Sequence, residues 1–347
     1  MKDTDFKQNI SHDFDKYYLT RALQLAYQIP LSSVKTNPRV GAVIVNAGKI
    51  IAEGAHQQFG GEHAEVTALK QLKDSDISTE TTLYVTLEPC NHFGKTPPCT
   101  ELIIERKISR VVIGCLDPNP LVAGKGVQRL QNAGIQVVVN DNQYDFQTLI
   151  KQFWVNQTLN RPFIILKWAQ SRDGFIAKIG QKTTISSYES QIQTHYLRSQ
   201  AMAILVGGNT ARIDTPILNN RFFINNLTQP IIYSASQNFP TQQFHIPPII
   251  VPNNPQLLKA GSEETIEWLQ QLLKTHHIGS ILVEGGTQTL NQFVSASLWD
   301  EAYRITAPIS LENGIKAPNA ESLSWKKIAL IGEDCWEKST NSTRVNK

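Results

Sequence analysis

Short apolar runs of strand length alternate with segments of helix length along most of the chain. Within the first half, the helix-length segments carry apolar residues at helical spacing. Strands are expected in 37–56, around a turn at Asn46-Ala47-Gly48, and at 82–88, 110–117 and 135–139; helices are expected at 15–29, 63–72, 97–108 and 124–134. Alternation of this kind builds layers of helices on a largely parallel sheet. The sequence therefore predicts an α/β fold.

The alternation of strand-length and helix-length segments is interrupted once and then resumes, which indicates two domains. Residues 140–162 are typical of a helix and connector, and the rhythm resumes after Pro162. Further strands are expected at 203–206, 230–233, 248–251 and 280–283, and further helices at 188–200 and 263–275. A length of 347 residues suits two domains better than one. We place the boundary near residue 157, with domains at 1–157 and 158–347.

Composition excludes several classes of protein. The net charge is only +3 and no basic-aromatic stripe occurs, so a nucleic-acid partner is not expected. The apolar runs are far shorter than a membrane span, and the first residues lack the apolar core of a signal peptide. The four cysteines are sparse, which favours a reducing, cytoplasmic location. Cys115, in an apolar run, and Cys335, near the polar C-terminus, are expected neither to pair with each other nor to bind metal.

A His-x-Glu pair and two Pro-Cys units indicate a catalytic zinc site. His63 and Glu65 are followed by Cys90, after Pro89, and by Cys99, after Pro98. One imidazole and two thiolates supply three ligands of a tetrahedral zinc and leave the fourth position to water. Glu65 would not ligate; it would move protons between the water and a leaving amine. This order is that of zinc deaminases, although here the cysteines are nine positions apart.

Other interpretations of these residues remain open at this point. Cys90 and Cys99 could be small buried hydrophobes, and His92 could ligate in place of His63. A structural zinc site would need a fourth protein ligand.

Longer stretches resemble a known family. NPRVGAVIV from residue 37, HAEVTAL from 63, YVTLEPCNHFGKTPPCT from 84 and DPNPLVAGKGVQRLQNAGI from 117 closely resemble the bifunctional deaminase/reductase of riboflavin biosynthesis. LKWAQSRDGFIA from 166, LRSQAMAILVGGNT from 197 and VEGGTQTL from 283 resemble its reductase half. The resemblance implies a cytidine-deaminase-like three-layer domain, then a dihydrofolate-reductase-like domain. It also implies a homo-oligomer, a dimer or a tetramer.

The same resemblance implies two consecutive reactions. A diaminohydroxypyrimidine carrying a phosphoribosylamino group would lose its 2-amino group by hydrolysis, with one zinc per chain. NADPH would then reduce the ribosyl group to a ribityl chain. The family's zinc ligands fall on His63, Cys90 and Cys99, and its proton shuttle falls on Glu65. Substrate contacts in the deaminase half fall on Asn37, Lys95 and Thr96, although Asn37-Pro38 could be a turn and the other two solvated loop residues.

No G-x-G-x-x-G occurs, but SILVEGGTQTL from residue 280 predicts a strand, a glycine turn and a helix start that could hold a pyrophosphate. A short echo of it, AILVGGNT, begins at residue 203. The family's cofactor contacts fall on Ala169, Thr184, Thr210, Asp214, Ser236, Gly286, Thr287, Gln288, Thr289, Leu290, Asn291 and Gln292. Its substrate contacts fall on Lys182, Arg198, Leu218, Arg221 and Glu284, and the two arginines are candidates to grip the ribose phosphate.

The reductase half departs from the family pattern at several positions. Lys182 and Thr184 stand where a serine and a tryptophan are usual, and Thr215 replaces the second Asp of Asp-Asp-Pro. Competing hypotheses are therefore a nucleobase or nucleoside deaminase with a non-catalytic C-terminal module, and a reductase half that serves only for dimerisation. A deaminase of nucleic-acid bases is disfavoured by the charge.

Overall fold

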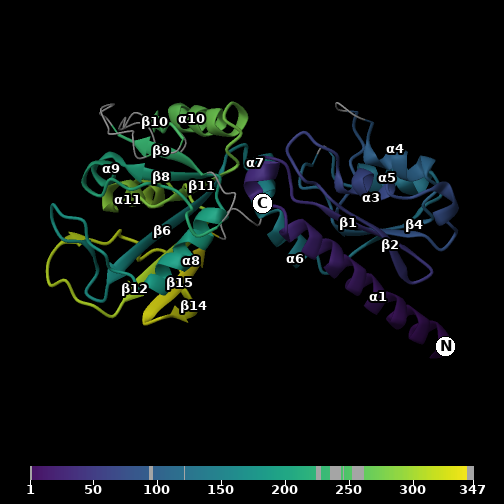
Figure 1. Cartoon of the computed structure of the whole chain (residues 1–347), viewed down its shortest axis with the longest axis horizontal. Coiled ribbons are helices and arrows are strands. Elements are labelled where there is room, and N and C mark those ends of the chain that lie inside the picture. Colours follow the sequence, from purple (N-terminus) through teal and green to yellow (C-terminus); the bar gives the residue numbers. More distant parts are fainter. Residues whose placement is uncertain are drawn as a thin grey trace. The chain divides into compact units, whose positions relative to one another are not determined.

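The computed structural model describes residues 2–93, 97–120, 122–223, 228–234, 244, 246–251 and 262–341, with side chains from residue 13 onward. The chain forms two compact units, residues 1–159 and 160–347 (Figure 1). In the described part of the chain, no helix is both long and apolar enough to cross a membrane.

The first unit is built on a five-stranded sheet with the order β2-β1-β3-β4-β5. Its strands are β1 (Gly41–Asn46), β2 (Lys49–Ala55), β3 (Thr82–Leu87), β4 (Arg110–Cys115) and β5 (Gln136–Val139). Strand β1 runs antiparallel to β2 and β3, whereas β3, β4 and β5 are parallel. The β1–β2 connection has positive φ at Ala47 and Gly48, which confirms the turn predicted there.

Helices cover both faces of this sheet. They are α1 (Lys2–Tyr27), α2 (Leu31–Val34), α3 (Ala64–Leu69), η1 (Asp74–Asp76), α4 (Cys99–Glu105), α5 (Lys125–Asn132), α6 (Tyr144–Leu149) and α7 (Lys151–Leu159). A Cβ on Gly41 would meet the Ala22 carbonyl of α1 at 2.0 Å, and one on Gly54 would meet the Ala64 carbonyl of α3 at 2.3 Å. Gly54 pairs with Ala42, the neighbour of Gly41, so α1 and α3 cover opposite faces. The unit is therefore a three-layer α/β/α structure.

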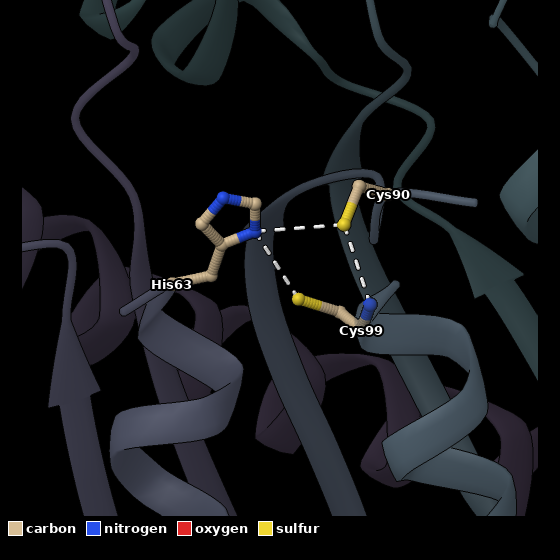
Figure 2. A group of neighbouring side chains, drawn as sticks. All are labelled: His63, Cys90 and Cys99. Carbon is tan, nitrogen blue, oxygen red and sulfur yellow. Dashed lines mark hydrogen bonds between the residues drawn. The ribbon is translucent and has the colours of Figure 1, made fainter. Parts of the chain in front are cut away.

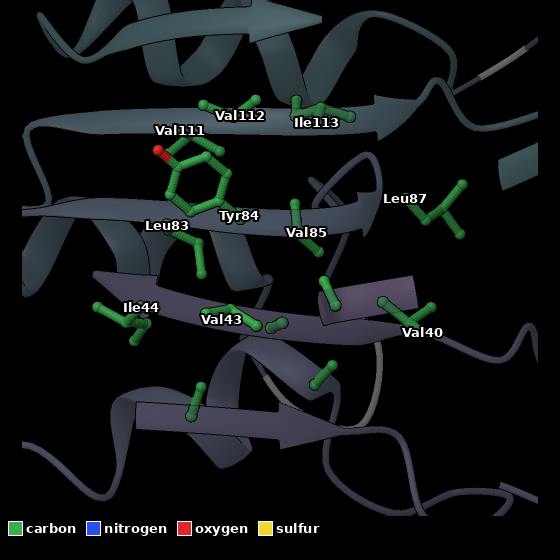
Figure 3. Packing of buried hydrophobic residues seen from close by; sticks show 14 of the residues in the cluster. Val40, Val43, Ile44, Leu83, Tyr84, Val85, Leu87, Val111, Val112 and Ile113 are labelled. Atoms are coloured by element: carbon green, nitrogen blue, oxygen red, sulfur yellow. The ribbon is translucent and has the colours of Figure 1, made fainter. Parts of the chain in front are cut away.

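The core of the first unit lies between these layers. Figure 3 shows the side chains of β1, β3 and β4, including Val43, Val85 and Ile113, which are fully buried. These strands are mostly apolar because both of their faces are covered by helices. This packing fixes the carboxyl ends of β3 and β4. The loop that carries the candidate zinc ligand Cys90 starts at the end of β3.

The second unit is built on an eight-stranded sheet with the order β10-β9-β8-β11-β6-β12-β15-β14. Its strands are β6 (Phe163–Ser171), β8 (Ala203–Gly207), β9 (Gln229–Tyr233), β10 (Ile249–Val251), β11 (Ser280–Val283), β12 (Glu301–Ala307), β14 (Lys326–Ile331) and β15 (Asp334–Thr340). A small second sheet pairs β7 (Phe175–Ala177) with β13 (Ile315–Lys316), and the helices are α8 (Tyr188–Ser199), α9 (Gly208–Ile213), α10 (Glu263–Lys274) and α11 (Thr287–Ser295). In this sheet order, the strands from β10 through β9, β8, β11 and β6 to β12 run parallel to one another. Strand β15 is antiparallel to both of its neighbours, β12 and β14.

The short sequence echo corresponds to two adjacent strands. Strands β8 and β11 pair in parallel, and each ends in a Gly-Gly turn that opens a helix, α9 or α11. The turns pack without space for side chains, because a Cβ on Gly207 would meet Thr289 Oγ1 at 2.5 Å and one on Gly285 would meet Thr289 Cβ at 2.9 Å. Two chain segments far apart in sequence therefore form one glycine-lined surface.

Candidate active sites

Three side chains converge near the carboxyl end of β3, the central strand of the first sheet (Figure 2). His63 is the residue before α3, Cys90 follows β3, and Cys99 is the first residue of α4. His63 Nδ1 lies 3.2 Å from Cys99 Sγ and 3.5 Å from Cys90 Sγ, and the Cys99 amide lies 3.3 Å from Cys90 Sγ. All three ligand atoms lie within 4.8 Å of one another. His92 is not a member of this group, and no fourth ligating side chain joins it among the described residues.

The protonation of these groups fits a metal centre. The hydrogen bond with Cys99 lowers the pKa of Cys90 to about 4, whereas the hydrogen bond with Cys90, together with burial, raises the pKa of Cys99. The hydrogen bond with Cys90 raises the pKa of His63 to about 9. One imidazole and two thiols with converging donor atoms are the ligand set that zinc prefers.

Glu65 lies in the first turn of α3, beside this group. Its side chain is buried, and burial raises the pKa of its carboxyl group. A carboxyl group in such surroundings takes up and releases a proton more readily near neutral pH than an exposed one does. Its position and protonation suit the proton-transfer role predicted for it.

His56 is a neighbour that the sequence analysis missed. Its Nδ1 lies 2.8 Å from the Glu62 carbonyl oxygen, which can only accept, so Nδ1 carries the proton. Its Nε2 lies 3.1 Å from Asn37 Nδ2 and accepts from that amide. The buried, neutral ring thereby orients Asn37, a predicted substrate contact, and its ring centroid lies 5.7 Å from that of His63. The other two predicted contacts, Lys95 and Thr96, lie outside the described residues.

The second unit has a cavity of about 940 Å³ at the carboxyl ends of β6, β8 and β11. Ligands of open α/β sheets gather at this edge. The glycine surface of the β8 and β11 turns forms part of its wall, and residues 176–178, 180–181 and 183–186 form another part. Most predicted cofactor contacts line it: Ala169, Thr184, Thr210, Asp214, Gly286, Thr287, Gln288, Thr289, Asn291 and Gln292.

Two predicted cofactor contacts are placed differently. Leu290 is fully buried in the core of the second unit and does not line the cavity. Ser236 lies outside the described residues.

Glu284 reaches this cavity and forms an ion pair there. Its carboxylate accepts from Arg198 Nε at 2.9 Å and from Nη2 at 2.6 Å, and Arg198 Nη1 donates to the Asn219 carbonyl oxygen at 3.1 Å. Burial alone would raise the pKa of Glu284, but the charges of Arg198 and Lys167 outweigh it and lower this pKa to about 2. Glu284 is therefore ionised at neutral pH.

Arg198 and the remaining predicted substrate contacts do not line the cavity. Arg198 is occupied by Glu284, so in this structure it orients a carboxylate instead of presenting its donors to a phosphate. Leu218 is buried, Arg221 lies on the surface 5.3 Å from the Phe222 ring centroid, and Lys182 is exposed. The charges of Arg198 and Arg221 both act on His195 and help to lower the pKa of its ring, after burial, to about 4.

Lys167, which the sequence analysis did not single out, lines the cavity beside Glu284. Burial lowers the pKa of its ammonium group.

The two sites define a class of protein: a zinc-dependent deaminase joined to an α/β reductase. Residues 12–115 match the cytidine and deoxycytidylate deaminase zinc-binding region, and residues 162–314 match the RibD C-terminal domain. The chain belongs to the RibD family, the bifunctional deaminase/reductases of riboflavin biosynthesis. It is accordingly an enzyme with both a hydrolase and an oxidoreductase activity, as the resemblance implied.

Relatives cover nearly the whole chain. The riboflavin biosynthesis protein RibD of Aquifex aeolicus is 38% identical over 93% of this chain and 97% of its own length. RibD of Escherichia coli is 36% identical over 92% of this chain and 97% of its own length. The solved structure of Acinetobacter baumannii RibD superposes with a TM-score of 0.81 at 30% identity, over 95% of this chain and 99% of that one.

A Thermotoga maritima structure gives a TM-score of 0.78 at 30% identity, over 95% of this chain and 99% of that one. It is described as a diaminohydroxyphosphoribosylaminopyrimidine deaminase/5-amino-6-(5-phosphoribosylamino)uracil reductase. The expected fold class, a deaminase-like domain followed by a dihydrofolate-reductase-like domain, is confirmed.

Replacing Cys115 with alanine should leave zinc stoichiometry unchanged. Cys115 is fully buried in β4 and is not a member of the metal-binding group, and Cys115 and Cys335 are both free thiols. Metal analysis of the purified variant would check this, with Cys90→Ala as the matched variant that should lose zinc. Reduced zinc in Cys115→Ala would show that the ligand set is wrong.

Proposed function

We propose that the first unit hydrolytically deaminates the 2-amino group of a diaminohydroxypyrimidine that carries a phosphoribosylamino group. The observation that carries the proposal is the convergence of His63, Cys90 and Cys99 next to the buried carboxyl group of Glu65. The Thermotoga maritima relative is named as a deaminase of this substrate class, which supports the choice of pyrimidine.

Each residue of this site has a separate role in the proposed deamination. His63, Cys90 and Cys99 would hold one zinc per chain, which when bound lowers the pKa of water and so supplies a nucleophile at neutral pH. Glu65 would accept a proton from the attacking water and deliver it to the departing amino group, which leaves as ammonia. Asn37, oriented by His56, would hold the pyrimidine, and Lys95 and Thr96 would bind the ribosyl phosphate.

We propose that the second unit then reduces the ribosyl group to a ribityl chain. The family match implies a nicotinamide cofactor, and we propose NADPH. The cavity would hold it with the pyrophosphate at the amino end of α11, along Gly286–Gln292, and with Ala169, Thr184, Thr210 and Asp214 on its walls. When bound, NADPH supplies a hydride. The ionised Glu284 would face the sugar and favour a cationic form of the opened ring, and Lys167 beside it would contact the sugar hydroxyls.

We assign the deaminase to residues 1–157 and the reductase to residues 158–347, close to the division between the compact units. The free thiols of the zinc site suit the reducing cytoplasm. The family resemblance favours a homo-oligomer, either a dimer or a tetramer. Lys182, Arg198, Leu218 and Arg221 stay predicted substrate contacts, and Ser236 and Leu290 stay predicted cofactor contacts.

The test is to incubate the protein with the phosphoribosyl diaminopyrimidine, with and without NADPH, and to identify the products by mass. Exchange of one amino group for oxygen is expected without NADPH, followed by gain of a hydride and a proton when NADPH is present. Deamination without reduction would support the alternative of a deaminase with a non-catalytic second unit. Deamination of free nucleosides but not of this substrate would support the nucleoside-deaminase alternative.

A further inference from the structure

A second carboxylate near the zinc centre, that of Glu88, is buried and takes no part in the mechanism above. It follows β3, two residues before Cys90, and only 4% of its surface is exposed. Its oxygens accept four backbone N–H groups: Oε2 from Asp117 at 3.2 Å and Gly124 at 3.0 Å, and Oε1 from Gly126 at 2.8 Å and Val127 at 3.2 Å. Hydrogen bonds to an ionised acceptor are stronger than those between neutral groups.

These four donors belong to one segment, which fits closely against Glu88. The segment runs from Asp117, just after β4, to the first turn of α5. A Cβ on Gly126 would meet the Pro89 carbonyl oxygen at 2.3 Å and Glu88 Oε1 at 3.0 Å. The chain can therefore approach the carboxylate at this point only because residue 126 is glycine.

The same segment is tied to the cysteine-bearing loops. Asn91 Nδ2 donates to the Lys125 carbonyl oxygen at 3.4 Å, and Asn91 Oδ1 accepts from Thr100 Oγ1 at 3.0 Å. The Thr100 amide donates to the Cys90 carbonyl oxygen at 3.3 Å. The carboxylate of Glu88 thus stands between the loops that carry Cys90 and Cys99 and the segment that starts at Asp117.

Asp117 directly follows Leu116, just after the end of β4, close enough to the zinc-ligand loop for the charges of that loop to act on it. Its side chain is partly buried, and the charges of Glu88, His92 and Cys90 all act on it. Its backbone amide is one of the four donors to Glu88. The place of the Asp117 side chain relative to Cys90 therefore depends on how Glu88 holds the segment.

We propose that Glu88 is a positioning residue of the deaminase, which fixes the backbone at Asp117 and at residues 124–127 as a wall of the substrate site beside the zinc-ligand loops. Glu88 acts through the backbone it holds and contacts neither the metal nor the reacting atoms. The inference rests on the deaminase site proposed above. It predicts that loosening this segment impairs substrate binding before it impairs metal binding.

The test is Glu88→Gln in the full-length, zinc-loaded protein. The amide keeps the size of the side chain but places an NH₂ group opposite two of the four backbone donors, so that part of the segment is released. We expect zinc stoichiometry and NADPH-dependent reduction to stay at the wild-type level. Deaminase kcat/KM should fall by about 10- to 100-fold, mainly through a higher KM.

Two further variants complete the design. Glu101→Gln is the matched control. Glu101 of α4 binds Arg129 of α5 at 2.7 and 3.0 Å, and both side chains are partly exposed, so the variant removes a carboxylate that binds α5 without changing the hydrogen bonds to Glu88. It should deaminate like the wild type. In Gly126→Ala, the added methyl group collides with the Pro89 carbonyl and with Glu88, and should displace the same segment. The KM for deamination should rise as in Glu88→Gln, so this variant tests the proposal even if Glu88→Gln does not fold.

Two results would overturn the inference. Wild-type KM and kcat in Glu88→Gln, even with a lower melting temperature, would make Glu88 a fold anchor only. Zinc lost in proportion to activity would show that it supports the ligands and not the substrate wall. Absence of deamination in the wild type would instead refute the proposed function, so the two failures are distinguishable.

Discussion

Replacing Glu65 with glutamine is expected to lower deamination by about 10²- to 10⁴-fold while zinc stays bound. Glu65 is buried next to the three candidate ligands, and the amide has the same shape but cannot carry a proton from water to the leaving amine. Because burial raises the pKa of Glu65, the carboxyl group holds its proton up to a higher pH than an ordinary glutamate, and the amide mimics its neutral form. Deamination rate and zinc content of the purified variant are the measurements.

Glu62→Gln is the control for this variant. Glu62 lies in the same segment, but its exposed side chain pairs with Lys70, and only its backbone carbonyl contacts His56. It should deaminate normally. Loss of stoichiometric zinc in Glu65→Gln would identify Glu65 as a ligand and contradict its role as a proton carrier.

Replacing Glu284 with glutamine is expected to lower reduction by roughly 10²-fold, the usual effect of removing one group that stabilises developing charge. Deamination in the same chain should persist, because the zinc site lies in the other compact unit. The variant also leaves Arg198 without its partner, and breaking a buried ion pair lowers stability by about 3–5 kcal/mol. Reduction must therefore be measured well below the melting temperature of the variant.

Asp300→Asn separates loss of function from loss of stability. Asp300 forms an equally buried bidentate pair with Arg161, 2.7 Å from each of two guanidinium nitrogens, in the same unit. It also binds the amide of Ile164, at the start of β6, whereas the cavity lies at the ends of the strands. Asp300→Asn should melt earlier yet reduce normally. Equal losses of reduction in both variants would assign Glu284 a structural role.

Helices and strands whose apolar residues form a clear pattern in the sequence could be predicted, and those without such a pattern could not. The predicted strands at 82–88 and 110–117 are observed as β3 and β4, because both faces of these strands are covered and every residue can be apolar. Strands β14 and β15 were not predicted, because they are polar, partly exposed and edged by Lys326 and Lys327. Helix α1 begins at Lys2, well before the predicted start at residue 15, because residues 2–13 are mostly polar and Phe6 and Ile10 are their only large apolar residues.

The zinc site was predictable because its chemistry lies in single residues with recognisable spacing. His63, Cys90 and Cys99 come together as the pattern predicted. His56, Lys167 and Glu88 were missed because their roles depend on partners distant in sequence, such as Asn37 and Glu284, or on backbone amides that any sequence would supply. The pairing of Arg198 with Glu284 was missed for the same reason: an isolated arginine and an isolated glutamate give no sign that they neutralise each other.

The contact between the glycine turns of β8 and β11 has an evolutionary consequence. A β-carbon at position 207 or 285 would meet Thr289, so a larger residue at either position requires a smaller one at position 289. Substitutions in the two segments should therefore be correlated among related chains, although neither segment forms a distinctive sequence motif by itself. A search for this kind of cavity should look for a co-varying pair of short strand-glycine-helix joints, because its glycine surface is divided between two strands and is not one contiguous motif.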